Sequence, residues 1–165
     1  MGNLWHWRPW WRSSATLPWP ERLVDGELEL APVRVPGKWR VGEYEFELRV
    51  GGQRAGRLTL RVGTDARLSG CLGHVGYRVE PEYRGHRYAA RGIRLVLPLA
   101  RRHGLDPLWI TCNPDNLASR RTIELAGGQY VETIPVPEAD PLRLQGDTEK
   151  CRYRLDLGGE AAAGG

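Results

Sequence analysis

Lysine is nearly missing from this sequence of 165 residues, and phenylalanine and methionine occur once each. Of the 24 basic residues only Lys38 and Lys150 are lysines, and the others are arginines. Arginine binds phosphate and carboxylate groups through paired hydrogen bonds, so the composition suits an anionic ligand, although codon bias explains it equally well. The basic residues are scattered and form no stripe, and nucleic acid is therefore not the expected partner.

Cysteine is scarce as well. Cys71, Cys112 and Cys151 show neither a CxxC motif nor the spacing of Cys and His ligands, so we expect reduced thiols and no metal site. No apolar run approaches the roughly 20 residues that span a bilayer, and the N-terminus lacks the apolar stretch of a signal peptide. These absences predict a cytoplasmic protein without a membrane partner.

The chain is long enough for one domain with a core of its own. We expect a segment rich in tryptophan and proline over residues 1–21, a single domain over 22–157 and a flexible tail over 158–165. The indole rings of the first segment either cover a core edge or a subunit interface, the latter giving a homodimer, or form an aromatic surface for a cationic ligand. The tryptophans concerned are Trp5, Trp7, Trp10, Trp11 and Trp19.

Periodicity of the apolar residues predicts the order of the elements. A period of two predicts strands, and a period of 3.6 predicts helices. The expected strands cover 27–35, 44–50, 55–62, 74–79, 108–112, 130–136 and 151–157, and the expected helices cover 88–103 and the residues between Asn116 and Gly127. A loop is expected over 63–70. This order predicts an α/β (α+β) fold with a sheet of mixed direction.

The turn between the strand at 74–79 and the following helix has the features of an anion site. It reads Arg84-Gly85-His86-Arg87-Tyr88-Ala89. Backbone N–H groups at a helix start have no intrahelical partner and carry the positive end of the helix dipole, so a pyrophosphate can bind where a small residue lets it approach. Arg84 adds a positive charge suited to phosphate. Without further context the same turn also fits an ordinary loop.

This turn resembles the coenzyme A signature of the GNAT superfamily of N-acyltransferases, whose usual form is Arg/Gln-x-x-Gly-x-Gly/Ala. Arg84 and Ala89 match its ends, whereas Arg87 stands where the central glycine is usual. The backbone N–H survives this replacement, but the larger side chain either crowds the phosphates or reaches the adenosine 3′-phosphate. The resemblance implies a mostly antiparallel sheet flanked by helices.

A second resemblance lies downstream, where residues 110–124 are similar to the fifth strand and following helix of that family. This helix often opens with Asn-x-x-(Ala/Ser), which Asn116 and Ser119 match. The resemblance implies that both contact the pantetheine arm; by themselves they also fit an N-cap and a surface serine. Acetyl-CoA is thus the expected co-substrate. Its expected contacts are Val79, Arg84, Gly85, His86, Arg87, Tyr88, Ala89, Asn116 and Ser119.

The family mechanism implies that a primary amine attacks the thioester directly, with the backbone near Val79 bonded to the thioester carbonyl. The amine must lose a proton. His74 is the leading candidate for the base, because a neutral imidazole accepts a proton near pH 7. Glu43, Glu47 and Glu80 are the alternatives.

The general acid is not evident from the sequence. Many family members carry a tyrosine after the asparagine, and Ile123 occupies that place here. The departing thiolate then takes its proton from water or from another residue, such as Tyr153.

Two other functions stay open. The departures from the family pattern at Ile123 and Arg87 also fit a domain that binds acyl-CoA without catalysis. The high arginine content fits a nucleic-acid-binding protein, whose affinity would depend on salt. The short link at Pro36–Gly42 predicts an open acceptor side, which favours a protein or peptide amine over a small molecule. The Trp-rich segment or a second subunit would complete that side.

Overall fold

The computed structural model describes residues 19–33 and 42–158, which form two antiparallel sheets with helices beside them. The five-stranded sheet has the order β1-β2-β3-β4-β5, and the three-stranded sheet has the order β6-β8-β7. The strands of the first are Leu23–Asp25, Leu28–Pro32, Glu43–Val50, Gln53–Arg61 and Val75–Val79; β6, β7 and β8 are Leu108–Cys112, Gln129–Pro135 and Glu149–Leu155. The helices are α1 (Tyr88–Arg102), α2 (Leu117–Leu125) and the single turn α3 (Pro141–Leu144).

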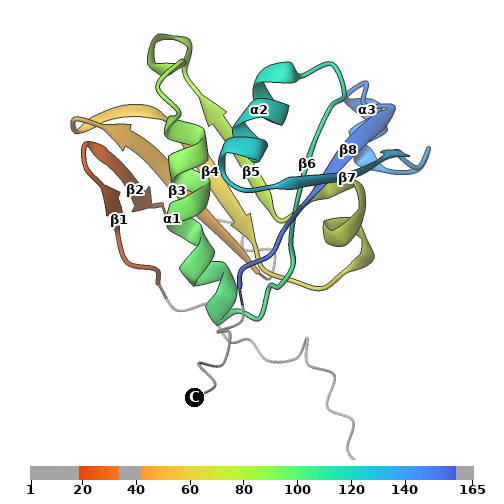
Figure 1. Ribbon diagram of the computed structural model, residues 1–165, viewed down its shortest axis with the longest axis horizontal. Coiled ribbons are helices and arrows are strands. Elements are labelled where there is room, and N and C mark those ends of the chain that lie inside the picture. The colour runs from red at the N-terminus through yellow and green to blue at the C-terminus, as the bar shows by residue number, and fades with distance from the viewer. Residues whose placement is uncertain (1–18, 34–41, 159–165) are drawn as a thin grey trace, which may run out of the picture.

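Helix α1 packs against one face of the five-stranded sheet, and the core lies between them (Figure 1). Alternate residues of β3 and β4 turn toward the helix, so Phe46 and Leu58 are fully buried. Ile93 and Val96 meet them from the apolar side of α1. The side chains between these positions point to the opposite face of the sheet, where the polar residues of both strands gather.

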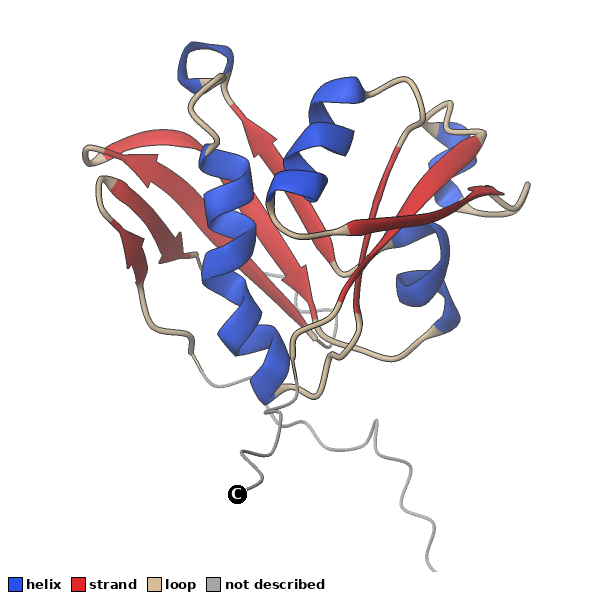
Figure 2. Cartoon of the chain, in the orientation of Figure 1, coloured by secondary structure: helices blue, strands red, loops and turns tan. Residues whose placement is uncertain are grey.

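The two sheets adjoin at one point and then diverge. The N–H of His74 donates to the carbonyl of Trp109 at 2.7 Å, just before β5 and within β6. From there β5 and β6 run in the same direction but separate, and each pairs instead with another strand, β5 with β4 and β6 with β8 (Figure 2). The separation opens space beside the start of α2.

The prediction of a mixed α/β fold with helices beside an antiparallel sheet is confirmed, and its strands and two long helices lie where expected. Four details differ. The sheet is divided in two, β1 and α3 were not predicted, and a helical turn at Leu68–Leu72 begins in the expected loop over 63–70 and extends two residues past it. The expected strand over 27–35 ends at Pro32.

The predictions for the Trp-rich segment and for the flexible C-terminal tail concern residues that lie mostly outside the described ranges. Most of the Pro36–Gly42 link lies outside them too. Across 19–33 and 42–158, no helix has the length and apolar character that a transmembrane passage requires.

Candidate functional site

A cavity of about 780 Å³ lies where the two sheets diverge. Strands β5 and β6 and the start of α2 form one part of its wall, and the polar face of β3 and β4 forms another. The turn at Leu68–Leu72, α3 and the residues that follow α3 close it on the remaining side. The cavity therefore extends from the gap between β5 and β6 to the face of the five-stranded sheet that α1 does not cover.

The expected phosphate loop begins where β5 ends. A 3₁₀ turn, Pro81–Tyr83, leads to Gly85, whose φ is +84°, and to Arg87, the N-cap of α1, with φ +61°. The N–H groups from Arg87 to Ala90 lie at the helix start and therefore have no intrahelical acceptor. No side chain caps them either. Open N–H groups on a helix start suit a phosphate.

The side chains of this loop are mostly exposed. Arg84 folds back so that its Nε donates to the carbonyl of Val79 at 2.9 Å, which brings its guanidinium to the end of β5. The rings of His86 and Tyr88 lie 5.5 Å apart. Arg87 holds a left-handed backbone conformation that favours glycine, which fits the glycine that is usual at this position.

Asn116 caps α2 as predicted, because its side-chain oxygen accepts a hydrogen bond from the N–H of Ser119 at 3.0 Å. Both residues line the cavity. The hydroxyl groups of Ser119 and Tyr77 form a hydrogen bond of 2.6 Å between α2 and β5. Burial raises the pKa of Tyr77 to about 12, so this phenol stays protonated at neutral pH.

Tyr77 was not predicted as a site residue. A tyrosine two positions before Val79 on an alternating strand reads as a core residue, and only the packing of α2 against β5 brings it to Ser119. In the sequence, a site role for Tyr77 could have been suspected only from its position on the strand that leads into the phosphate loop.

His74 lies at the junction of the sheets and is buried. Its Nδ1 accepts a hydrogen bond from the N–H of Trp109 at 2.9 Å, so the ring proton belongs on Nε2, which faces the carbonyl of Gly63 at 3.3 Å. Burial lowers the pKa of His74. Both nitrogens are thus engaged by the backbone, and His74 does not line the cavity.

Tyr153 and Ile123 are also buried away from the cavity wall. The hydroxyl of Tyr153 accepts a hydrogen bond from Nε of Arg120 at 3.1 Å, and burial raises the pKa of Tyr153. Ile123 is fully buried in the core. Tyr153 therefore does not reach the cavity directly, and Arg120 is the donor in its hydrogen bond.

Of the carboxylates considered as bases, Glu43 lines the cavity. Glu47 faces Arg49 at 3.4 Å, and Glu80 precedes the 3₁₀ turn; neither belongs to the cavity wall. Glu45, two residues beyond Glu43 on the same strand, lines the cavity as well. Sequence reasoning missed Glu45, although its alternation with Tyr44 and Phe46 placed it on the face of Glu43.

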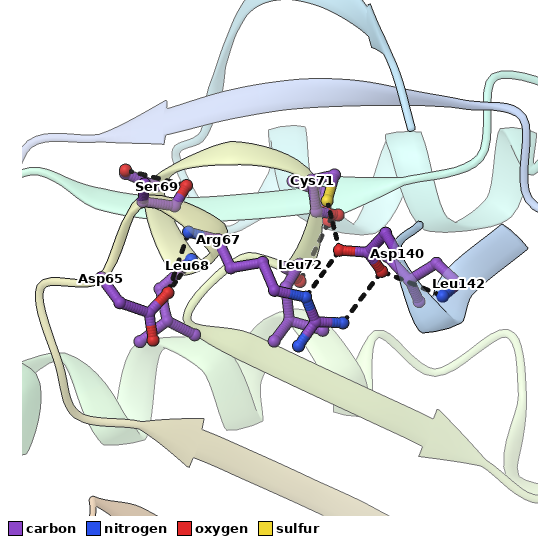
Figure 3. Close-up of polar contacts among 10 residues, drawn as sticks. Asp65, Arg67, Leu68, Ser69, Cys71, Leu72, Asp140 and Leu142 are labelled. Atoms are coloured by element: carbon purple, nitrogen blue, oxygen red, sulfur yellow. Dashed lines mark hydrogen bonds and ion pairs between the residues drawn. The ribbon is translucent and has the colours of Figure 1, made fainter. Parts of the chain in front are cut away.

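An ion pair holds two parts of the cavity wall together (Figure 3). Asp140 is buried at the start of α3, and both its oxygens accept from Arg67, at 2.6 Å from Nε and 3.0 Å from Nη2. It also accepts from the N–H of Leu142 at 2.9 Å and lies 3.5 Å from the Cys71 thiol. The guanidinium holds the pKa of Asp140 well below its usual range. This pair, the Arg67–Asp140 clamp, ties α3 to the turn at Leu68–Leu72.

Polar residues on the same side neutralise one another. Lys150 lies 2.7 Å from a carboxylate oxygen of Asp147 and donates to the side-chain oxygen of Asn113 at 2.6 Å. Asn113 in turn donates to Asp147 at 2.8 Å. In the described ranges, no group of three or more His, Cys, Asp or Glu side chains is arranged to hold a metal ion.

Comparison with known proteins gives a match over most of the chain. Residues 4–129 match the family described as Acetyltransferase (GNAT) domain, a range that includes most of the Trp-rich segment. Among curated proteins none matches this sequence.

Solved structures share the fold. RimL, a ribosomal L7/L12 alpha-N-protein acetyltransferase in complex with coenzyme A, superposes with a TM-score of 0.63 at 16% identity, over 84% of this chain and 100% of that one. A putative ribosomal-protein-serine acetyltransferase from Vibrio cholerae gives 0.60 at 13% identity, over 85% and 99%. The microcin C7 self-immunity acetyltransferase MccE, in complex with acetyl-CoA and AMP, gives 0.55 at 16% identity; the match covers 70% of this chain but only 61% of that one.

Proposed function

Because this chain belongs to the GNAT acetyltransferase family, we propose that it moves an acetyl group from acetyl-CoA to a primary amine by direct attack on the thioester. The expectation of a GNAT-type acetyltransferase is confirmed by the family match. The identity of the amine and the roles of single residues are our proposal. One observation carries it, namely that a cavity lined by the polar face of β3 and β4 opens beside β5, the strand that leads to a helix start with open N–H groups.

Coenzyme A binds, in this proposal, at the end of β5 and along α2. Its pyrophosphate meets the N–H groups of residues 85–90, and Arg84 supplies positive charge. Asn116 and Ser119 contact the pantetheine arm from the first turn of α2. The backbone near Val79 bonds the thioester carbonyl, where negative charge grows during the attack. Arg84 already bonds the carbonyl of Val79, which leaves its terminal N–H groups for phosphate.

The general acid in this proposal is the hydrogen-bonded pair of Tyr77 and Ser119. Both line the cavity, and their hydroxyl groups are protonated at neutral pH. When the C–S bond breaks, Ser119 passes its proton to the departing sulfur and receives the proton of Tyr77. Tyr153, the candidate from the sequence, is the alternative, but its hydroxyl faces Arg120.

The general base in this proposal is Glu43, which accepts the proton of the amine directly or through one water molecule. Glu43 faces the cavity, and within the described ranges it has no ion pair within 4 Å. His74 is the competing candidate. Its only lone pair is bonded to Trp109, so it can act only after that bond breaks.

The amine acceptor belongs to a protein, a peptide or a small molecule, and the setting is cytoplasmic. RimL acts on a ribosomal protein, whereas the MccE structure holds AMP, and the two neighbours favour different acceptors. The chain spans less than two thirds of MccE but all of RimL. The open acceptor side predicted from the short Pro36–Gly42 link favours a protein or peptide amine.

Calorimetric titration of acetyl-CoA tests the cofactor site. Wild type is expected to bind, and Arg84→Ala and Gly85→Trp are expected to weaken binding, the second because a side chain at φ +84° strains the loop. Arg101→Ala, a loss of charge in the last turn of α1, is the control and leaves binding unchanged. Failure of the folded wild type to bind acetyl-CoA would refute the proposal.

Release of the coenzyme A thiol with a panel of amines then tests catalysis. Turnover with any primary amine supports the enzyme. Binding without turnover across the panel would favour the non-catalytic acyl-CoA-binding module. Salt-dependent binding of oligonucleotides, without binding of acetyl-CoA, would favour the nucleic-acid alternative.

A further inference from the structure

Arg61, at the end of β4, faces the cavity but has no role in the reaction described above. Its side chain is partly buried, and burial lowers the pKa of the guanidinium. One terminal nitrogen, Nη1, donates to the carbonyl of Gly73 at 3.3 Å. The rest of the group lies over Gly76 on β5, next to the space where the sheets diverge.

The absence of a side chain at Gly76 leaves room for this guanidinium. A Cβ added there would come within 3.1 Å of Nη2 and 3.5 Å of Nη1 of Arg61, and its three nearest atoms all belong to that side chain. The φ of Gly76 lies outside the left-handed region, so the backbone itself does not require glycine. A side chain at this position would crowd Arg61.

Arg61 forms no ion pair with the residues the structure describes, although its cross-strand partner Glu43 acts on its charge at longer range. Within 19–33 and 42–158 no carboxylate lies within 4 Å of it. Its cross-strand partner Glu43 sits on β3, the neighbour of β4 away from β5. Strands lie about 4.8 Å apart, so a group over β5 is about 10 Å from the backbone of β3. A partly buried charge without a close counter-ion is costly, and an anionic ligand lowers that cost.

The position of Arg61 favours an anionic group of the acceptor over one of coenzyme A. Gly76 precedes Val79 by three residues, which places Arg61 about 10 Å from the phosphate loop along β5. The same polar face carries Glu43 and Glu45 on β3. This wall of the cavity therefore presents carboxylates at one side and a guanidinium at the other, an arrangement that complements a ligand with both an ammonium and a carboxylate group.

We propose that the acceptor is an amine that also carries a carboxylate, and that Arg61 binds this carboxylate. The inference rests on the proposed acetyl transfer and names the substrate class for it. A free amino acid and a peptide with an acidic residue near its N-terminus share this chemistry. The two sources differ in how much of the cavity they fill and are separated by experiment.

The experiment compares matched acceptors by thiol release. One arm uses a free amino acid and its amide, and the other uses a short peptide with aspartate or asparagine at its second position. Wild type is expected to prefer the carboxylate form by about 10- to 100-fold in kcat/KM, the range of a hydrogen bond to a charged group. The arm with the larger preference identifies the source.

Three variants test whether Arg61 causes the preference. Arg61→Met is expected to abolish it, lowering kcat/KM for the carboxylate acceptors to the level of their amides. Gly76→Ala is expected to reduce it, because the new methyl group displaces the guanidinium by a few tenths of an ångström. Arg54→Met, an exposed arginine on the same strand outside the cavity wall, is the control and keeps the preference. The affinity for acetyl-CoA is measured in each.

The outcomes that overturn the inference are distinct from those that overturn the proposed function. Equal rates with carboxylate and amide acceptors would overturn the inference alone. Weaker acetyl-CoA binding by Arg61→Met would assign the anion to coenzyme A and overturn it too. No transfer to any amine, by a chain that binds acetyl-CoA, would refute both.

Discussion

Asp140→Asn removes the charge of the Arg67–Asp140 clamp and keeps the shape of the side chain. The carboxylate accepts two short bonds from Arg67, and its own side chain is only 5% exposed. Hydrogen bonds to charged groups contribute about 1.5–3 kcal/mol. Since the Arg67 side chain is 42% exposed and regains water when released, we expect a loss of about 2 kcal/mol. For a chain of this size that lowers Tm by about 4–8 °C.

Urea unfolding followed by tryptophan fluorescence measures this loss, since the chain contains seven tryptophans. A double-mutant cycle with Arg67→Met isolates the pair, and we expect a coupling energy of about 1–2 kcal/mol. The control pair is Arg154 and Asp156, which lie equally close at 2.7 Å but are both about half exposed. An exposed pair of this kind is expected to couple by less than 1 kcal/mol.

The pH dependence provides an independent check. Arg67 lowers the pKa of Asp140 in the folded state, so the stabilisation is present above the unfolded pKa of about 3.9 and is lost as pH falls below it. The difference in stability between wild type and Asp140→Asn should therefore be constant above about pH 5 and shrink below about pH 4. Additive single variants, or a difference that does not depend on pH, would refute this account of the clamp.

The site yields three further predictions. Arg87→Gly should relieve a left-handed backbone and stabilise the fold by up to about 1 kcal/mol, measured by urea unfolding; destabilisation would show that the Arg87 side chain makes a contact worth more. Tyr77→Phe and Ser119→Ala should each lower kcat at least 10-fold, with acetyl-CoA affinity little changed by Tyr77→Phe and lowered by Ser119→Ala, and unchanged kcat would remove the pair from the reaction. Glu43→Gln should lower kcat/KM at least 100-fold, whereas His74→Gln should lower stability more than it changes the pH–rate profile; the reverse would make His74 the base.

Several elements were predictable because their signals are local. The alternation around Tyr44–Val50 and the helical period after Tyr88 depend only on neighbouring residues, and both elements lie where that pattern predicts. Asn116 caps α2 through a bond to Ser119, three residues away. The small helical elements at Leu68–Leu72 and α3 were missed because a turn of four or five residues carries no period.

The site roles depended on contacts between distant parts of the chain. His74 looked like a base because nothing near it in the sequence shows that Trp109, 35 residues on, occupies its lone pair. Tyr77 received no role from the sequence because Ser119, its partner, lies 42 residues away. The cofactor loop remains a prediction from its motif, to which the structure adds the open N–H groups at the start of α1.

By itself the sequence determined the order and kind of the main elements and, through two short motifs, the family. Periodicity, capping and turn residues act over a few positions, so they can be read without a fold. Only the tertiary structure decided that β5 and β6 separate, since each finds a better partner elsewhere in the chain. It also decided which polar groups face the resulting cavity and which are bonded within the protein, because a side chain's partners are set by packing and not by its neighbours in sequence.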